Sequence, residues 1–386
     1  MSLACRLCDQ PLFPDPLLCQ HHMPAAAQEL PTAATLSADG GVSLALHQCS
    51  ACGVVQLTNP PVPYYRDVIR AAGLSAEMRA FRLQQFGAWV AGHDLAGKPV
   101  LEVGCGQGEY LALLREAGVD AWGLEHRAAS VAHCQTQGLQ VLQGFMEGPE
   151  TRFAGPGIPG HFDGFAILNF LEHIPAAHRT LAGIAAHLSP GASGLVEVPN
   201  FDMILKAGLF AEFIPDHLHY FTQATLTGLL ERSGFEVLEC RPEWHDYVLS
   251  ATVRKRQPLD LSSLNQRQHA LADEFRRFLA GFAPGRVAIW GAGHQALALI
   301  SLMDIAPHIR YVLDSAPFKQ GRYTPATHLP IVPPERLAEG EVDAVIVLAA
   351  SYSDEVLRTL RARHGSRFRT AALRGEHLVC DPEPQP

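Results

Sequence analysis

Two pairs of cysteines near the start of the chain have the spacing of metal ligands. Cys5 and Cys8 form one Cys-x-x-Cys pair, and Cys49 and Cys52 form a second pair within Cys-Ser-Ala-Cys-Gly. Each pair can present two thiolates to one ion, and four thiolates complete a tetrahedral zinc site with Zn–S distances of ~2.3 Å. Because four protein ligands leave no open position, the predicted Zn2+ is structural. A redox dithiol is the alternative, but nothing resembling a thioredoxin helix follows either pair.

A glycine-rich segment further along the chain predicts a nucleotide-like ligand. The apolar run Pro99–Val103 leads into Gly-Cys-Gly-Gln-Gly at 104–108. Glycines let the backbone turn sharply and approach a ligand closely, at a helix start that offers free N–H groups. The glycine pattern alone is also compatible with a nicotinamide-binding domain.

Three further features favour S-adenosyl-L-methionine as that ligand. Glu102, inside the strand, suits a positively charged amino or sulfonium group better than a pyrophosphate. Glu125 ends the next expected strand, where a carboxylate can bind both ribose hydroxyls, and an apolar Phe-Met pair after the third strand can enclose an adenine ring. The predicted cofactor site therefore contains Glu102, Gly104, Cys105, Gly106, Gly108, Glu125, Phe145, Met146 and Asn169.

Composition divides the chain into three blocks that would position these residues. Residues 1–63 are rich in Cys, His, Pro and Gly, which suits a small metal-binding module. Residues 64–256 alternate helical patterns with short apolar runs, the pattern of a parallel sheet covered by helices. Residues 257–386 contain a helical stretch, about 264–282, and then a second strand–glycine–helix unit from 287. They predict a smaller Rossmann-like α/β domain.

The bulk composition argues against several classes of protein. Hydrophobic residues make up 47% of the chain and charged residues 18%, as in a folded protein. A net charge of -9 and a pI near 6.1 give no basic field for nucleic acid. No segment approaches the ~18 consecutive apolar residues of a membrane helix, and the start lacks the apolar core of a signal peptide. We therefore expect a cytoplasmic protein without a membrane partner.

The cysteine pairs, the glycine loop and the second α/β domain together resemble the three-domain, zinc-containing sugar C-methyltransferases of bacterial deoxysugar and natural-product pathways. Those enzymes are class I S-adenosylmethionine-dependent methyltransferases. Besides the glycine loop, the resemblance is carried by residues 49–57, 171–174, 216–221 and 318–331. It implies a Rossmann-like core with a seven-stranded sheet. It also implies a small-molecule substrate, a nucleoside-diphosphate 4-keto sugar that is methylated on the carbon next to its ketone.

That reaction needs a general base to remove the proton next to the ketone, and histidine is the usual choice. The family's base motif, approximately Tyr-His-Glu-His, falls on residues 214–217 of this chain. The resemblance thus implies His217 as the base and Asp216 as the carboxylate that orients it. Ile214 replaces the tyrosine, so His219 or Tyr220 is expected to stand in for its phenol. A packing or capping role is the alternative for each of these side chains.

Two further groups are expected to contact the substrate. His173, at the end of the fourth strand, can donate a hydrogen bond to the keto or enolate oxygen. Lys319 and Arg322 are the expected cations for the diphosphate, with a solvated loop as the alternative. An O- or N-methyltransferase on the same frame remains a second hypothesis, and a metal-dependent regulatory protein with a vestigial pocket remains a third.

Overall fold

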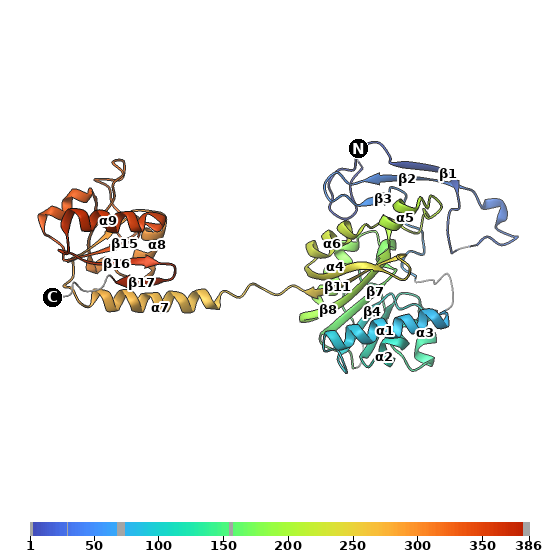
Figure 1. The fold of residues 1–386 in the computed structure, drawn as a ribbon. Helices are drawn as coiled ribbons and strands as arrows, with labels where there is room; N and C mark the ends of the chain where they lie inside the picture. The colour runs from blue at the N-terminus through green and yellow to red at the C-terminus, as the bar shows by residue number, and fades with distance from the viewer. Residues whose placement is uncertain (1–2, 29, 68–73, 154–156, 381–386) are drawn as a thin grey trace. The chain divides into compact units, whose positions relative to one another are not determined.

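A computed structural model of the chain describes residues 3–28, 30–67, 74–153 and 157–380. The chain divides into two compact units, residues 1–257 and residues 258–386 (Figure 1). The four cysteines of the two pairs and the glycine loop both belong to the first unit.

The first unit is built on a seven-stranded sheet with the order β10-β11-β8-β7-β4-β5-β6. Its strands are β4 (Pro99–Val103), β5 (Asp120–Glu125), β6 (Gln140–Gln143), β7 (Phe162–Leu168), β8 (Leu188–Pro199), β10 (Phe235–Glu243) and β11 (Val248–Lys255). Strands β6, β5, β4, β7 and β8 are parallel, whereas β11 runs antiparallel to both β8 and β10. The sheet confirms the predicted Rossmann-like core, and its parallel strands end at one common edge where ligands bind in such folds.

Helices cover both faces of this sheet (Figure 1). On one face lie α1 (Ala76–Gly92), α2 (Glu109–Glu116) and α3 (Ala128–Thr136); on the other lie α4 (Ala177–Ala186) and α6 (Gln223–Arg232). Successive residues of a strand point to opposite faces. Leu101 and Val103 of β4 thus join the core under α4 and α6, while Val100 joins the core under α1 and α2. Because both faces are buried, the strand reads as a continuous apolar run.

A second, four-stranded antiparallel sheet joins the N-terminal block to this core. It consists of β1 (Leu18–Met23), β2 (Val42–Gln48), β3 (Val55–Leu57) and β9 (His219–Tyr220). The first three strands come from residues 1–63, but β9 comes from the methyltransferase block. The backbone N–H of Leu57 also donates to the carbonyl of Leu218, at 3.0 Å. The segment that begins at His217 is therefore positioned by the N-terminal block. The short α5 (Phe201–Ala207) packs against this sheet.

The second unit has a six-stranded sheet with the order β14-β13-β12-β15-β16-β17. Its strands are β12 (Val287–Trp290), β13 (Ile309–Leu313), β14 (Ile331–Val332), β15 (Ala344–Val347), β16 (Arg369–Arg374) and β17 (His377–Cys380). Its helices are α7 (Ser262–Leu279), α8 (His294–Leu302) and α9 (Ser353–His364). Helix α7 occupies most of the predicted helical stretch and buries Phe275 and Phe278 in the core of this unit. None of the helices in the described parts of the chain is long and apolar enough to cross a membrane.

Candidate active site

The glycine loop needs its glycines for conformation and for space. Gly104, Gly106 and Gly108 have φ values of 76°, 58° and 86°, in the left-handed region that other residues rarely adopt. A Cβ atom on Gly104 would lie 2.4 Å from Cδ1 of Phe170. Cys105, between the first two glycines, is fully buried. The loop therefore brings bare backbone to the edge of the sheet at the start of α2.

Two buried carboxyl groups flank this loop, as the sequence predicts. Glu102 lies in β4 and Glu125 ends β5. Glu125 accepts hydrogen bonds from the backbone N–H of Gly106, at 3.0 Å, and of Arg127, at 2.8 Å. Burial raises the pKa of Glu125, while these backbone hydrogen bonds oppose the rise. Glu125 is thus held next to the loop, where the sequence predicts the ribose.

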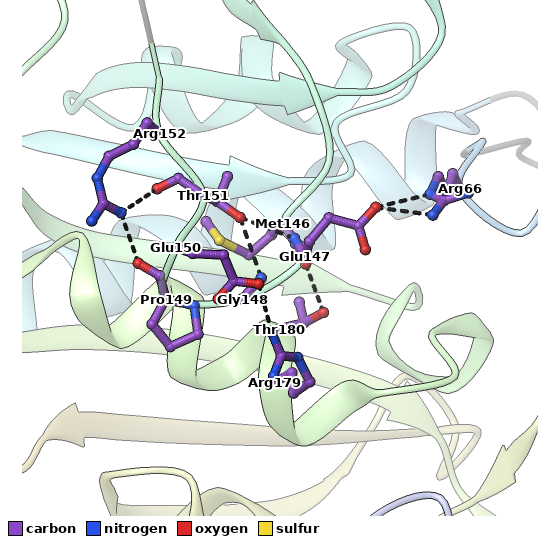
Figure 2. A network of polar contacts seen from close by, with 10 residues as sticks. All are labelled: Arg66, Met146, Glu147, Gly148, Pro149, Glu150, Thr151, Arg152, Arg179 and Thr180. Atoms are coloured by element: carbon purple, nitrogen blue, oxygen red, sulfur yellow. Dashed lines mark hydrogen bonds and ion pairs between the residues drawn. The ribbon is translucent and has the colours of Figure 1, made fainter.

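The Phe145–Met146 pair divides between the pocket and the core. Phe145 is partly exposed, and its ring meets Phe170 edge-on with centroids 6.2 Å apart. Met146 is fully buried under α4, and its carbonyl accepts the Thr180 hydroxyl at 2.8 Å (Figure 2). Of the two residues, Phe145 is therefore the one whose ring can meet an adenine.

A short segment after the N-terminal block reaches this aromatic ring. The Arg66 guanidinium lies 5.4 Å from the centroid of Phe145 and pairs with Glu147 at 2.9 Å (Figure 2). Tyr65 packs edge-on against the same ring at 5.9 Å. A partly exposed aromatic ring with a guanidinium group beside it is a suitable surface for the adenine ring of a cofactor.

Two histidines and a glutamate come together beyond the end of β7. His173 and His217 have ring centroids 4.7 Å apart, with their planes at 83°. Oε1 of Glu172 lies 3.7 Å from Nε2 of His173 and 4.0 Å from Nε2 of His217. The Glu172 side chain is 1% exposed, whereas those of His173 and His217 are 25% and 21% exposed. The imidazoles thus reach the surface of the site, and the carboxyl group lies behind them.

Burial sets the protonation of these three groups. It raises the pKa of Glu172 to about 8. It lowers the pKa of His173 to about 4, although the nearby Asp216 works in the opposite direction. Burial and the neighbouring His173 hold the pKa of His217 well below its usual range. In the ligand-free protein at neutral pH, both imidazoles are neutral, as a base requires.

Asp216 is bound elsewhere. Its Oδ1 accepts the Tyr64 hydroxyl at 2.8 Å, and its Oδ2 accepts the backbone N–H of Ala27 at 3.0 Å. Burial and the hydrogen bond to Asp216 raise the pKa of Tyr64 to about 12. These groups border a cavity of about 40 Å³ that is lined by Gln28, Val62, Tyr64, Tyr65, Asp67, Asn169, Phe170, His173 and Asp216. The predicted partner of His217 thus faces a tyrosine, and Glu172 is the carboxyl group that faces the histidines.

His219 and Tyr220 have structural contacts in β9. Nε2 of His219 lies 3.1 Å from the carbonyl oxygen of Ile174, and burial lowers the pKa of this fully buried side chain to about 3. The Tyr220 hydroxyl accepts from the N–H of Ile214 at 3.1 Å and donates to its carbonyl at 3.3 Å. Neither side chain takes the place of the missing phenol, so we leave both out of the catalytic group proposed below.

Sequence reasoning missed two residues of this site. Glu172 lies inside the Leu-Glu-His-Ile stretch that carried the resemblance, but nothing in a linear pattern shows that it faces His217. Tyr64 is the first residue of the second block of the chain, and its hydroxyl contacts Asp216, which is 152 residues away in the sequence. The adjacent Tyr64-Tyr65 pair, just after the cysteine-rich block, was the available signal.

The four cysteines of the N-terminal block converge on one point. Their Sγ atoms all lie within 4.8 Å of one another, with Cys5 3.7 Å from Cys52 and Cys8 3.5 Å from Cys49. Ligands of a tetrahedral Zn–S4 site are roughly 3.8 Å apart, as follows from the Zn–S length. The donor set therefore fits zinc.

The expected phosphate-binding cations of the second unit differ in their contacts. Lys319 pairs with Asp314 at 2.9 Å, and Asp314 also accepts the backbone N–H of Ala292 at 2.9 Å. Arg322 is exposed. Arg322 is thus the more accessible charge. Lys319 is paired with Asp314, which binds the backbone of the glycine turn at residues 291–293.

Comparison with known proteins agrees with this architecture. Residues 71–240 match a family model described as a methyltransferase domain, and residues 257–371 match one described as a C-methyltransferase C-terminal domain. The chain is 26% identical over 323 residues to the C-methyltransferase NovU of Streptomyces niveus, which covers 75% of this chain and 73% of that protein. It is 34% identical over 128 residues to a ubiquinone biosynthesis O-methyltransferase of an Azoarcus species, covering 32% of this chain and 53% of the relative. With its seven-stranded sheet and glycine loop, the chain belongs to the class I S-adenosylmethionine-dependent methyltransferases.

Proposed function

We propose that the enzyme transfers a methyl group to a carbon next to a ketone, on a nucleoside-diphosphate keto sugar, with His217 as the general base. One observation carries the proposal. Two neutral, partly exposed imidazoles, those of His173 and His217, lie beyond the end of β7, next to the residues predicted to wall the cofactor. An oxygen acceptor needs less from a base than a carbon acceptor does, because an O–H proton is more acidic than a C–H proton next to a ketone. A carbon acceptor therefore needs a positioned base that is unprotonated at neutral pH.

The residues would divide the work as follows. S-adenosyl-L-methionine, when bound, supplies an electrophilic methyl group. His217 takes the proton from the substrate carbon, and the electrons of that C–H bond form an enolate. His173 donates a hydrogen bond to the enolate oxygen, which stabilises the charge that develops there. The carbon then attacks the methyl group, with proximity supplying much of the rate.

Other parts of the chain would hold the substrate and the site. Tyr64 supplies the phenol that is missing at position 214, because its hydroxyl lies at the cavity beside Asp216. The four cysteines bind a structural zinc ion, which fixes the sheet that ends in β9 and so fixes His217 at its edge.

The names of two relatives support different acceptor atoms. NovU is a C-methyltransferase and matches most of this chain, including part of the second unit, whereas the O-methyltransferase matches about a third of it. We therefore favour carbon and keep oxygen or nitrogen as the second candidate.

Mass spectrometry after incubation with isotope-labelled S-adenosyl-L-methionine and a panel of nucleoside-diphosphate keto sugars tests the proposal. We expect label on carbon, and near-complete loss of transfer in His217→Asn. His161→Asn, a change at an exposed histidine of the same unit, is the matched control and should transfer normally. Label only on oxygen or nitrogen, with a modest effect of His217→Asn, would support the second candidate. Absence of calorimetric heat with S-adenosyl-L-methionine would support the regulatory hypothesis.

A further inference from the structure

We propose that Glu172 is the positioning residue for the base: its carboxylate, lying behind the two imidazoles, sets which nitrogen of His217 meets the substrate and must be ionised for proton removal. The inference rests on the proposed function, because it concerns the base of that reaction. Glu172 itself meets neither substrate nor cofactor, since its side chain is 1% exposed.

The backbone fixes Glu172 and His217 relative to each other. Glu172 lies in the 3-10 turn Leu171–His173, directly after β7. Its carbonyl accepts the N–H of Leu218 at 2.9 Å, so the residue after the base is tied to the main chain of Glu172. Oε1 then lies 4.0 Å from Nε2 of His217 and 3.7 Å from Nε2 of His173. A carboxylate that faces Nε2 favours the tautomer with its proton there and leaves Nδ1 to accept a proton from the substrate.

The surroundings of Oε2, the other carboxyl oxygen, also support a role for Glu172 beside the base. Oε2 is buried and makes no hydrogen bond with the described residues. A buried carboxyl oxygen without a partner is costly unless a compensating charge appears beside it. An imidazolium at His217 faces Oε1 and would stabilise the ionised carboxyl group as a whole, and it forms only when the base has taken its proton.

The proton balance requires a group that stabilises this state. Methylation converts a sulfonium and a C–H bond into a thioether and a C–CH3 bond, and it releases one proton. That proton first rests on His217, where an ionised Glu172 makes the pair neutral overall. It then leaves through a partly exposed imidazole, because Glu172 has no access to water.

The ionisable groups around Glu172 predict a direction for the pH dependence. His173 and His217 face its Oε1, and Asp216 lies beyond them with its carboxylate bound to Tyr64. Burial raises the pKa of Glu172 to about 8. The competent form, with Glu172 ionised, is therefore populated as pH rises through that value. The positive sulfonium of bound cofactor favours the ionised carboxylate, so with saturating cofactor the same rise occurs at lower pH.

Glu172→Gln, which keeps the size and removes the charge, tests this role. Methyl transfer to thymidine-diphosphate 4-keto-6-deoxyglucose, used as a probe, is measured from pH 6 to pH 9. We expect kcat to fall on the order of 100-fold with KM little changed, because base catalysis contributes about 10²–10⁴-fold. We also expect the rise of kcat/KM with pH to disappear. Glu77→Gln, at an exposed glutamate of the same unit, is the matched control and should keep the wild-type profile. An unchanged pH profile in Glu172→Gln would overturn the inference.

Two measurements without substrate separate this inference from the proposed function. In the 15N spectrum of histidine-labelled enzyme recorded at about pH 9, where Glu172 is ionised, Glu172→Gln should lower the fraction of His217 that carries its proton on Nε2. That change of tautomer would support the Glu172–His217 pairing even if His217→Asn kept its activity, which would refute only the base role. An unchanged tautomer ratio would refute the pairing. Metal analysis completes the test: a second zinc ion that is lost in Glu172→Gln would assign the cluster to a metal and overturn the inference.

Discussion

Glu172 should make the fold less stable, and replacing it with glutamine should raise the free energy of unfolding in a pH-dependent way. Its carboxyl group is buried, and Oε2 makes no hydrogen bond with the described residues. An unfolded chain would expose that group to water and ionise it at its ordinary pKa of 4.5, whereas the folded protein holds it neutral until about pH 8.

The sign and size follow from proton linkage. Below pH 4.5 both states keep the proton, so Glu172 has no pH-dependent cost. Between pH 4.5 and pH 8 the folded state keeps a proton that the unfolded state releases. The free energy of unfolding therefore falls by about 1.4 kcal/mol per pH unit through this one group. The cost reaches about 3 kcal/mol at pH 7 and about 4 kcal/mol at pH 8, and it levels off at about 5 kcal/mol above pH 8. Glutamine does not ionise, so Glu172→Gln removes the pH-dependent cost.

Urea unfolding at pH 5, 6, 7 and 8, followed by tryptophan fluorescence, measures this effect. Trp290 is the only tryptophan in the second unit, so a Trp290→Phe background restricts the signal to the first unit. The stability gained by Glu172→Gln should grow by about 1.4 kcal/mol per pH unit. Glu77→Gln should show no such growth. A difference between Glu172→Gln and wild type that stays constant across these pH values would refute the reasoning.

Three further predictions concern the cofactor loop, the zinc ion and the phenol. Gly104→Ala should abolish S-adenosyl-L-methionine binding in a calorimetric titration, because its Cβ would lie 2.4 Å from Phe170; Gly97→Ala has a similar φ of 69° but no atom within 4 Å, and should bind normally. Removal of zinc by a chelator should melt the sheet that includes β9 and reduce methyl transfer, with metal analysis showing one zinc per chain beforehand; full activity of zinc-free protein would contradict this. Tyr64→Phe, which removes the 2.8 Å hydrogen bond to Asp216, should lower kcat roughly tenfold, as the loss of a charge-assisted hydrogen bond of ~1.5 kcal/mol implies. Tyr65→Phe should have little effect on kcat, and equal losses in the two variants would argue against a role for the Tyr64 hydroxyl.

The parts of the fold that depend on local pattern were predictable from the sequence. The buried strand Pro99–Val103 is a continuous apolar run because both of its faces are covered, and the glycines after it are required by positive φ values. The zinc ligands were predictable because the tight turn of each Cys-x-x-Cys pair places two sulfur atoms on one side, where they can bind the same ion. In all of these, the signal lies within a few residues of the feature it predicts.

The catalytic group was less predictable because it is made by contacts between distant segments. His217 and His173 were expected in the site, but the carboxyl group beside them was expected at Asp216, the neighbour in sequence, and not at Glu172, the neighbour in space. Residues 219–220 looked like a catalytic motif, whereas they form a strand paired with β3 of the N-terminal block. Periodicity cannot show such a pairing, because a two-residue strand has no period.

The position of the transferred methyl group tests the central claim most directly. The enzyme would be given S-adenosyl-L-methionine with a 13C methyl group and a nucleoside-diphosphate 4-keto sugar with 13C at the carbon next to the ketone. The account predicts a one-bond 13C–13C coupling in the product spectrum, present with wild-type enzyme and with His161→Asn, and lost with His217→Asn. A product that carries the labelled methyl group without this coupling, on oxygen or nitrogen, would contradict it.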